Sequence, residues 1–188
     1  MTSHITAMTG LSGVGKSTLL RKLLARVNFQ HVQASALIKM GRQLVGDIVS
    51  SVDQLRDADL DANQRVLIHA FWRTVDPAFN LIILDGHSVI ERDDGLTLIS
   101  PDVFGAIGIK SMIFLADDPV AIEYRRASDA KRSRLVKSVE NLQSTQNAAL
   151  SHAGEICHTL GVPLHVFSPA QYDAIGGLLL SYRFEGSH

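Results

Sequence analysis

The chain has 188 residues, 46% of them hydrophobic and 20% charged, a composition typical of one folded domain and not of disordered, fibrous or low-complexity proteins. Its 18 Lys and Arg residues nearly balance its 19 Asp and Glu residues, so no overall charge points to nucleic acid or to an acidic membrane surface. The single cysteine, Cys157, cannot form an internal disulfide, and no stretch approaches the roughly 18 apolar residues of a membrane-spanning helix, so we expect one cytoplasmic domain over residues 1–188.

Apolar runs alternate with helical patterns along the whole chain, and no repeat or linker-like tract interrupts them. The elements predicted by these patterns are, in chain order, a strand over residues 5–9, a helix over 17–27, a brief strand over 31–33, a helix over 36–48, a helix from 61 to about 76, a strand over 81–84, a short helix over 101–106, a strand over 111–116, a helix opening at 119, a long helix over 138–160, a strand over 164–167 and a C-terminal helix from about 168. Ser35 and Ser100 are the expected N-caps of the second and fourth helices. We expect Phe71 and Trp72 in the core.

Strands separated by helices predict an α/β fold with a parallel sheet covered on both faces. The run over residues 81–84 is apolar at every position, which is typical of a central parallel strand. Ligands of such sheets bind at the carboxyl ends of the strands. Polar segments follow three of the predicted strands directly, at residues 10–17, 85–87 and 117–118. We therefore expect the functional site among these segments.

The segment from Gly10 to Ser17 matches the pattern G-x-x-x-x-G-K-[ST] without a mismatch, between a predicted strand and a predicted helix. Its glycines let backbone N–H groups turn toward a phosphate, and the start of the helix adds to the attraction. Lys16 is expected to reach the β- and γ-phosphates of ATP, and the Ser17 hydroxyl to bind Mg²⁺. The expected nucleotide-binding residues are Gly10, Leu11, Ser12, Gly13, Val14, Gly15, Lys16, Ser17 and Thr18. This segment, called the phosphate loop below, does not by itself distinguish binding, hydrolysis and transfer.

Asp85 directly follows the predicted central strand. A carboxylate at that place can order metal-bound water or accept a proton from a substrate, so Asp85 joins Ser17 as a candidate for the metal site. The alternative is an aspartate that only ends a strand. His87 is a candidate for acceptor binding, although with eight histidines in the chain its position could be a coincidence.

Six basic residues lie within the 13 positions from Arg125 to Lys137. Arginines that close over a moving phosphoryl group stabilise its charge and exclude water. The segment over about residues 125–137 is predicted to form such a lid. The alternatives are a solvated basic helix face and an RNA contact.

Polar residues at 54–57 and 63–65 lie between the phosphate loop and the strand over 81–84. Arg56 is a candidate to hold an acceptor phosphate, and the amide of Gln64 suits the edge of a base. The alternative is a pair of helices with ordinary surface charges.

Taken together, these residues resemble the nucleoside monophosphate kinases and, among them, the archaeal-type adenylate kinases and the small adenylate-kinase-like ATPases. The resemblance runs from Gly10 to about Phe167. The motifs that carry it are the phosphate loop, Asp85-Gly86-His87, the segment with Arg125, Arg126, Asp129, Arg132 and Arg134, the row Gln54-Leu55-Arg56-Asp57 followed by Gln64, and the pair Gln143 and Gln146. Leu142 and Asn147 depart from the histidine and arginine of the archaeal enzymes.

The resemblance implies a P-loop three-layer sandwich with a five-stranded parallel sheet of order 2-3-1-4-5, a small helical acceptor-binding insertion over about residues 35–76 and a short lid. It implies an enzyme that transfers the γ-phosphoryl group of ATP, with Mg²⁺, to a nucleoside monophosphate, AMP first. The catalytic residues would be Lys16, Asp85, Arg126, Arg132 and Arg134, and the acceptor-binding residues Ser35, Arg56, Gln64, His87 and Gln143.

Two other activities stay open at this point. One is a partner-regulated ATPase, and the other is a kinase of a small metabolite. A protein partner or a homo-oligomer is compatible with either, whereas the sequence gives no membrane signal and no strong nucleic-acid signal.

Overall fold

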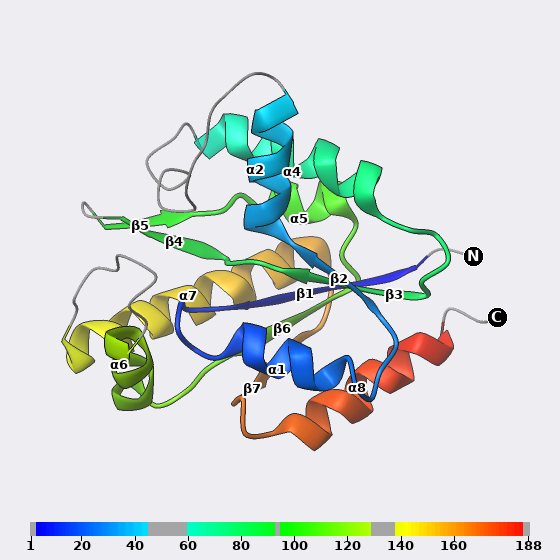
Figure 1. Ribbon diagram of the computed structural model, residues 1–188. Coiled ribbons are helices and arrows are strands. Elements are labelled where there is room, and N and C mark those ends of the chain that lie inside the picture. The colour runs from blue at the N-terminus through cyan, green and yellow to red at the C-terminus, as the bar shows by residue number, and fades with distance from the viewer. Residues whose placement is uncertain (1–2, 45–59, 93–94, 129–137, 186–188) are drawn as a thin grey trace.

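The computed structural model describes residues 3–44, 60–92, 95–128 and 138–185, which form alternating strands and helices (Figure 1). The elements are β1 (His4–Gly10), α1 (Lys16–Leu23), β2 (Gln30–Gln33), α2 (Ala34–Leu44), α4 (Leu60–Thr74), β3 (Leu81–Asp85), β4 (Val89–Arg92), β5 (Gly95–Leu98), α5 (Pro101–Ile107), β6 (Ser111–Leu115), α6 (Pro119–Ser128), α7 (Val139–Leu160), β7 (Leu164–Phe167) and α8 (Tyr172–Glu185). The α/β class predicted from the alternating patterns is confirmed.

Five strands form one sheet in the order β2-β3-β1-β6-β7, and every pairing in it is parallel. When only the strands of this sheet are counted along the chain, the order is the expected 2-3-1-4-5. In the register, Met8 of β1 lies beside Asp85 of β3, and Gly10 of β1 lies beside Leu115 of β6. The segments that follow β1 and β3 therefore leave the sheet at the same edge.

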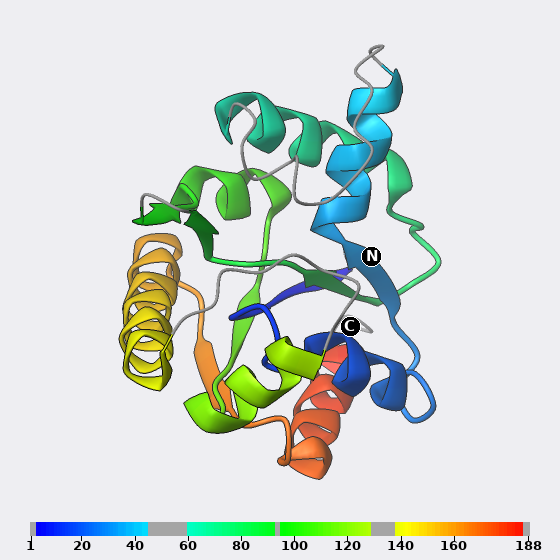
Figure 2. The same ribbon diagram turned by 60° about the vertical axis from the view of Figure 1, so that its left-hand side comes forward.

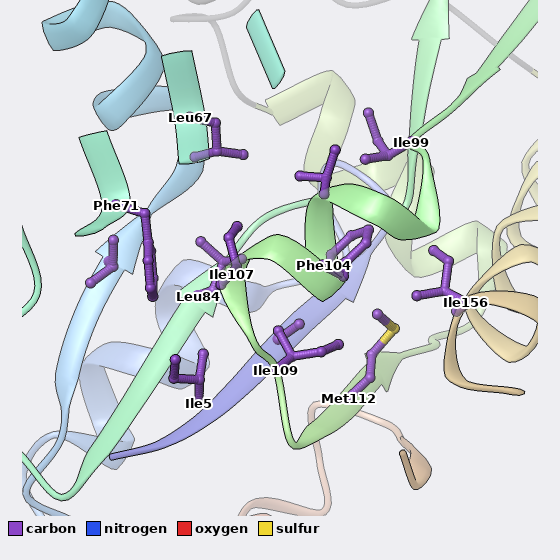
Figure 3. Packing of buried hydrophobic residues seen from close by; sticks show 14 of the residues in the cluster. Ile5, Leu67, Phe71, Leu84, Ile99, Phe104, Ile107, Ile109, Met112 and Ile156 are labelled. Carbon is purple, nitrogen blue, oxygen red and sulfur yellow. The ribbon is translucent and has the colours of Figure 1, made fainter. Parts of the chain in front are cut away.

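Helices cover both faces of the sheet (Figures 1 and 2). Side chains alternate between the two faces of a strand, and in β1 Ile5 and Ala7 enter one apolar cluster whereas Met8 enters the other. The first cluster packs the sheet against α2, α4, α5 and α7, and Figure 3 shows part of it around Phe104 and Ile107. The second cluster packs the sheet against α1, α6 and α8. Two cores thus hold a three-layer sandwich.

A two-stranded antiparallel hairpin of β4 and β5 lies outside the five-stranded sheet. No sequence pattern described above predicts it. Its strands have four residues each and are mostly half-buried or exposed, so they lack the continuous apolar run of the central strands. The Asp93-Asp94-Gly95 turn signal between Val89 and Leu98 is the feature that indicates a hairpin here.

Helix boundaries follow the predicted caps in some places and not in others. The Ser100 side chain accepts a hydrogen bond from the Asp102 N–H at the start of α5, as predicted. Helix α2, in contrast, begins at Ala34, so Ser35 is its second residue and the predicted N-cap is wrong. Helix α8 begins at Tyr172, a few residues later than expected. For α2 and α8 the type of element is right and the first residue differs, and the predicted end of the second helix near residue 48 lies outside the described residues.

The core prediction for the neighbouring aromatic residues of α4 is half right. Phe71 is fully buried, whereas Trp72 is 52% exposed and its indole N–H donates to the Ala106 carbonyl oxygen at 3.1 Å. Successive residues of a helix point about 100° apart, and the buried side of α4 holds Ala70 and Phe71 while Trp72 lies beyond its edge. Among the helices that the structure describes, none has both the length and the apolar composition required to cross a membrane.

Candidate active site

The phosphate loop connects β1 to α1 at the carboxyl edge of the sheet, and three of its residues need to be glycine. Gly10, Gly13 and Gly15 have φ of 138°, 86° and 109°, in the region that favours glycine. At Gly10 a Cβ would also lie 2.5 Å from the carbonyl oxygen of Leu115 in β6. The backbone therefore adopts a turn that ordinary residues would strain, which is the conformation that the glycine pattern predicts.

The start of α1 and the Ser12 hydroxyl fit a phosphate group. Gly15 is the N-cap of α1, with no side-chain cap and no acidic residue in the first turn, so the positive end of the helix faces the loop without a protein anion. The Ser12 hydroxyl is buried and has no hydrogen-bond partner among the described residues. Buried hydroxyls are seldom left unsatisfied, and a phosphate oxygen would supply the missing partner.

Lys16 and His87 converge on one backbone oxygen at the base of the loop. Lys16 is 8% exposed, and its amine donates to the Gly10 carbonyl oxygen at 3.0 Å. His87 Nδ1 lies 2.7 Å from the same oxygen and 3.4 Å from Lys16 Nζ. A carbonyl oxygen only accepts, so His87 carries its hydrogen on Nδ1 in this arrangement. The structure thus brings two of the predicted site residues together.

Asp85 is the last residue of β3 and is 5% exposed. Its carboxylate accepts a hydrogen bond from His31 Nε2 at 3.3 Å. Burial alone would raise the pKa of Asp85, but the hydrogen bond from His31 and the positive charges of Lys16 and His87 lower that pKa below its ordinary value. The buried group is therefore a carboxylate at neutral pH, able to bind a cation or accept a proton.

His31 was not among the residues that the sequence pointed to. It lies on β2 two residues before Gln33, which pairs with Asp85 in the sheet register. Residues two apart on a strand share a face, so His31 lies diagonally across from Asp85. Only the register of β2 and β3 reveals this neighbour, because 54 residues separate the two in the sequence.

Two arginines of α6 contact the outside of the phosphate loop. Arg126 Nε donates to the Ser12 carbonyl oxygen at 2.8 Å, and its two terminal nitrogens donate to the Glu91 carboxylate at 3.1 and 2.5 Å. Arg125 Nε donates to the Gly13 carbonyl oxygen at 2.8 Å. Glu91 comes from the hairpin that the sequence did not predict. The alternative of a wholly solvated basic face therefore does not describe Arg126, whose side chain is 7% exposed.

The predicted acceptor residues lie on several elements. Ser35 is in the first turn of α2, and the preceding Ala34 would be 3.5 Å from a Cβ at Gly86, so the start of α2 adjoins the segment after Asp85. Gln64 is half-buried on α4, which packs against α2. Gln143 lies on α7 in a shallow groove beside α6, and its amide donates to Asn147 at 2.9 Å.

Arg56, Arg132 and Arg134 lie outside the described residues, as does most of the predicted lid. Within the part of the chain that is described, no group of three or more His, Cys, Asp and Glu side chains gathers into a metal cage. Mg²⁺ bound with a nucleotide usually needs only one or two protein ligands. Exposed Ser17, in the first turn of α1, and Asp85 supply the oxygen atoms that such an ion prefers.

Comparison with known proteins agrees with this fold. Residues 9–143 match a protein-family model described as an AAA domain, and no curated protein matches the chain significantly. A solved structure of shikimate kinase from Bacteroides thetaiotaomicron aligns with 95% of this chain and 97% of its own, at 16% sequence identity and a TM-score of 0.55. The structure of TT1252 from Thermus thermophilus aligns with 96% of this chain and 98% of its own, at 14% identity and a TM-score of 0.52. These similarities establish a fold shared with a P-loop kinase.

Proposed function

Because this chain belongs to the AAA domain family and carries a complete phosphate loop, we propose that it is a phosphotransferase that moves the γ-phosphoryl group of ATP to a small acceptor. The observation that carries the proposal is the meeting of Lys16 and His87 at the base of the loop, beside a buried Asp85 that stays ionised. Simple nucleotide binding would not need a buried carboxylate next to the phosphate position.

The loop and Lys16 would hold the nucleotide phosphates. The Ser12 hydroxyl and the N-terminus of α1 offer donors, and the Lys16 amine would exchange the Gly10 carbonyl oxygen for a phosphate oxygen. Ser17 and Asp85 would hold Mg²⁺, which when bound neutralises charge on the phosphate oxygens. Arg132 and Arg134 of the predicted lid would add positive charge near the transferred group, whereas the charge of Arg126 is already paired with Glu91.

A nucleoside monophosphate, with AMP as the first candidate, is the acceptor that the family resemblance favours. Ser35 in the first turn of α2, next to Ala34, which lies near Gly86, and half-buried Gln64 on α4 support an acceptor near the segment that follows Asp85. Arg56 would bind the acceptor phosphate, with His87 and Gln143 as further candidate contacts. Because a phosphate acceptor is already a competent nucleophile, the residues would mainly position it.

A kinase of a small metabolite is the second candidate, and the pair of Asp85 and His31 favours it. A hydroxyl acceptor must lose a proton, and Asp85, which its lowered pKa keeps ionised, is a buried carboxylate that can accept one. The likeness of the fold to a shikimate kinase structure is compatible with such an acceptor.

The test is phosphoryl transfer from Mg-ATP across AMP, CMP, UMP, GMP, the deoxynucleoside monophosphates, small hydroxylated metabolites and water. Lys16→Ala is the blank, and Lys22→Ala, an exposed lysine of the same helix, is its matched control. Diphosphate formation with one monophosphate would name a nucleotide acceptor, and a phosphorylated hydroxyl would name a metabolite. Slow phosphate release that no acceptor accelerates would overturn the proposal in favour of a partner-regulated ATPase.

A further inference from the structure

Two consecutive carbonyl oxygens of the phosphate loop are each bound by an arginine of α6. Arg126 Nε donates to Ser12 and Arg125 Nε donates to Gly13, both at 2.8 Å. The carbonyl and the N–H of one trans peptide point in opposite directions. Arg126 therefore fixes the Gly13 N–H so that it points away from α6. The direction of loop N–H groups decides whether they can converge on a phosphate.

Each arginine is in turn held by a carboxylate from another element. Glu91 of β4 binds both terminal nitrogens of Arg126, and the two side chains are 10% and 7% exposed. Asp117, just after β6, binds Arg125 at 2.5 Å in a more exposed pair. Bidentate pairing restricts both the position and the plane of a guanidinium group. Arg126 is thus fixed at all three of its nitrogens.

Asp117 is in turn held by two hydrogen bonds to a residue of α7. Gln146 is buried, its amide nitrogen donates to the Asp117 carbonyl oxygen, and its amide oxygen accepts from the Asp117 N–H, both at 3.0 Å. The two carboxylates therefore come from different parts of the fold, one from β4 of the hairpin and one from the segment that follows β6.

We propose that Glu91 and Asp117 are positioning residues of the nucleotide site, which hold Arg126 and Arg125 on the Ser12 and Gly13 carbonyls and so fix the phosphate loop in its binding shape before nucleotide arrives. This inference rests on one part of the proposed function, namely that the loop binds nucleotide phosphates. Glu91 also neutralises much of the positive charge of Arg126. Such a neutralised guanidinium suits a role in holding the loop backbone.

The test is the Kd of Mg-ATP, measured by isothermal titration calorimetry on the full chain. Glu91→Gln keeps the size of the side chain and removes its charge, and Glu123→Gln is the matched control because Glu123 is an exposed glutamate on α6. We expect Glu91→Gln to weaken binding roughly tenfold and Glu123→Gln to leave it unchanged. Asp117→Asn, in the more exposed pair, should weaken binding about threefold, and it serves as the test variant if Glu91→Gln does not fold.

Two further measurements separate positioning from general destabilisation. Inorganic triphosphate should lose the same factor in affinity as ATP, because the defect lies in the phosphate-binding backbone. Arg126→Gln combined with Glu91→Gln should bind no more weakly than the poorer single variant, because Glu91 acts through Arg126.

The outcomes also distinguish this inference from the proposed function. A wild-type chain that binds no ATP would contradict the nucleotide site itself. A wild-type chain that binds ATP, with Glu91→Gln and Asp117→Asn binding it equally or more tightly, would overturn the positioning role. Tighter ATP binding in these variants would mean that, in the wild-type chain, the two carboxylates prevent the arginines from binding the nucleotide.

Discussion

Two polar clusters lie at opposite ends of the strands of the parallel sheet, and burial acts differently on the pKa values of their titratable groups. At the amino end, His4 Nε2 lies 3.1 Å from the Ser111 hydroxyl, which lies 2.9 Å from that of Thr6. The His4 ring stacks on Tyr182 with ring centroids 4.0 Å apart. Burial, helped by the charge of Lys110, lowers the pKa of His4 to about 4. The cluster is therefore neutral at physiological pH.

At the carboxyl end, neighbouring charges outweigh burial. Asp85 is as buried as His4, yet His31, Lys16 and His87 keep its pKa below the ordinary value. Holding an ionised group in a buried place is costly unless a partner compensates it, so such groups often mark functional sites. Polarity alone therefore does not identify the site. The end where charge is retained beside the phosphate loop is the one that suits phosphate chemistry.

The largest expected effect comes from a substitution in the charged cluster at the carboxyl ends of the strands. Lys16→Ala removes the amine that lies at the base of the loop, and we expect phosphoryl transfer to fall about 10³-fold, because a donor aimed at developing charge is lost. Initial rates with the best acceptor measure this. Lys22→Ala, on the exposed side of α1, should retain wild-type rates, and equal rates for both variants would contradict the assignment of Lys16.

The next largest effect concerns the backbone of the phosphate loop, which positions the charged cluster. Gly10→Ala places a Cβ near the Leu115 carbonyl oxygen at a φ of 138°, and we expect a loss of about 3 kcal/mol in the free energy of unfolding from strain and overpacking. Urea unfolding measures it. Gly177→Ala on α8 meets no atom within 4 Å and should stabilise the protein by about 0.5 kcal/mol. Similar losses in both variants would refute the steric explanation.

Asp85→Asn tests whether the retained charge matters for the reaction. A carboxamide neither accepts a proton nor neutralises a cation, so we expect transfer to fall about 10²-fold. The chain should stay folded, since the amide oxygen can still accept from His31. Asp102→Asn, an exposed aspartate on α5, is the matched control. Transfer that survives unchanged in Asp85→Asn would mean that Asp85 only ends β3.

The smallest expected effect concerns the neutral cluster around His4, at the amino ends of the strands. The pKa of His4 falls from 6.5 in the unfolded chain to about 4 in the folded one, so between these values the unfolded chain binds the extra proton. Stability from this group is complete above pH 6.5 and falls as the pH drops toward 4, by on the order of 1 kcal/mol. Denaturant unfolding at pH 7 and pH 4.5 measures the slope.

His4→Gln should flatten that slope, while the same change at exposed His69 should leave it in place. A slope that persists in His4→Gln would assign the acid sensitivity to another group. Asp85 acts in a different range: its lowered pKa contributes stability that is lost only as the pH falls below its ordinary value of 3.8.

The sequence predicts those features that depend on local chemistry. The glycines at 10, 13 and 15 are required by positive φ, and the buried strand over residues 81–84 has the apolar run of a central parallel strand. Ser100 and Pro101 open α5 as expected, because a cap depends on residues only two or three apart.

Features that depend on tertiary neighbours could not be predicted in the same way. His31 reaches Asp85 only through the register of β2 and β3, and Glu91 reaches Arg126 only because the hairpin lies against α6. Local signals for both were weak: a histidine in a four-residue edge strand, and an Asp-Gly turn between short, half-exposed strands. Trp72 shows the opposite error, because its apolar character suggested burial that α4 and α5 do not provide.

The most direct test of the contrast between the two ends is backbone hydrogen exchange of the wild-type chain, with and without Mg-ATP, read by mass spectrometry. We predict slower exchange in peptides that cover Gly10 to Thr18 and the Arg125-Arg126 pair, with no change around His4 and Ser111. Unchanged exchange in the phosphate loop at saturating Mg-ATP, or protection confined to the amino end of the strands, would contradict this prediction.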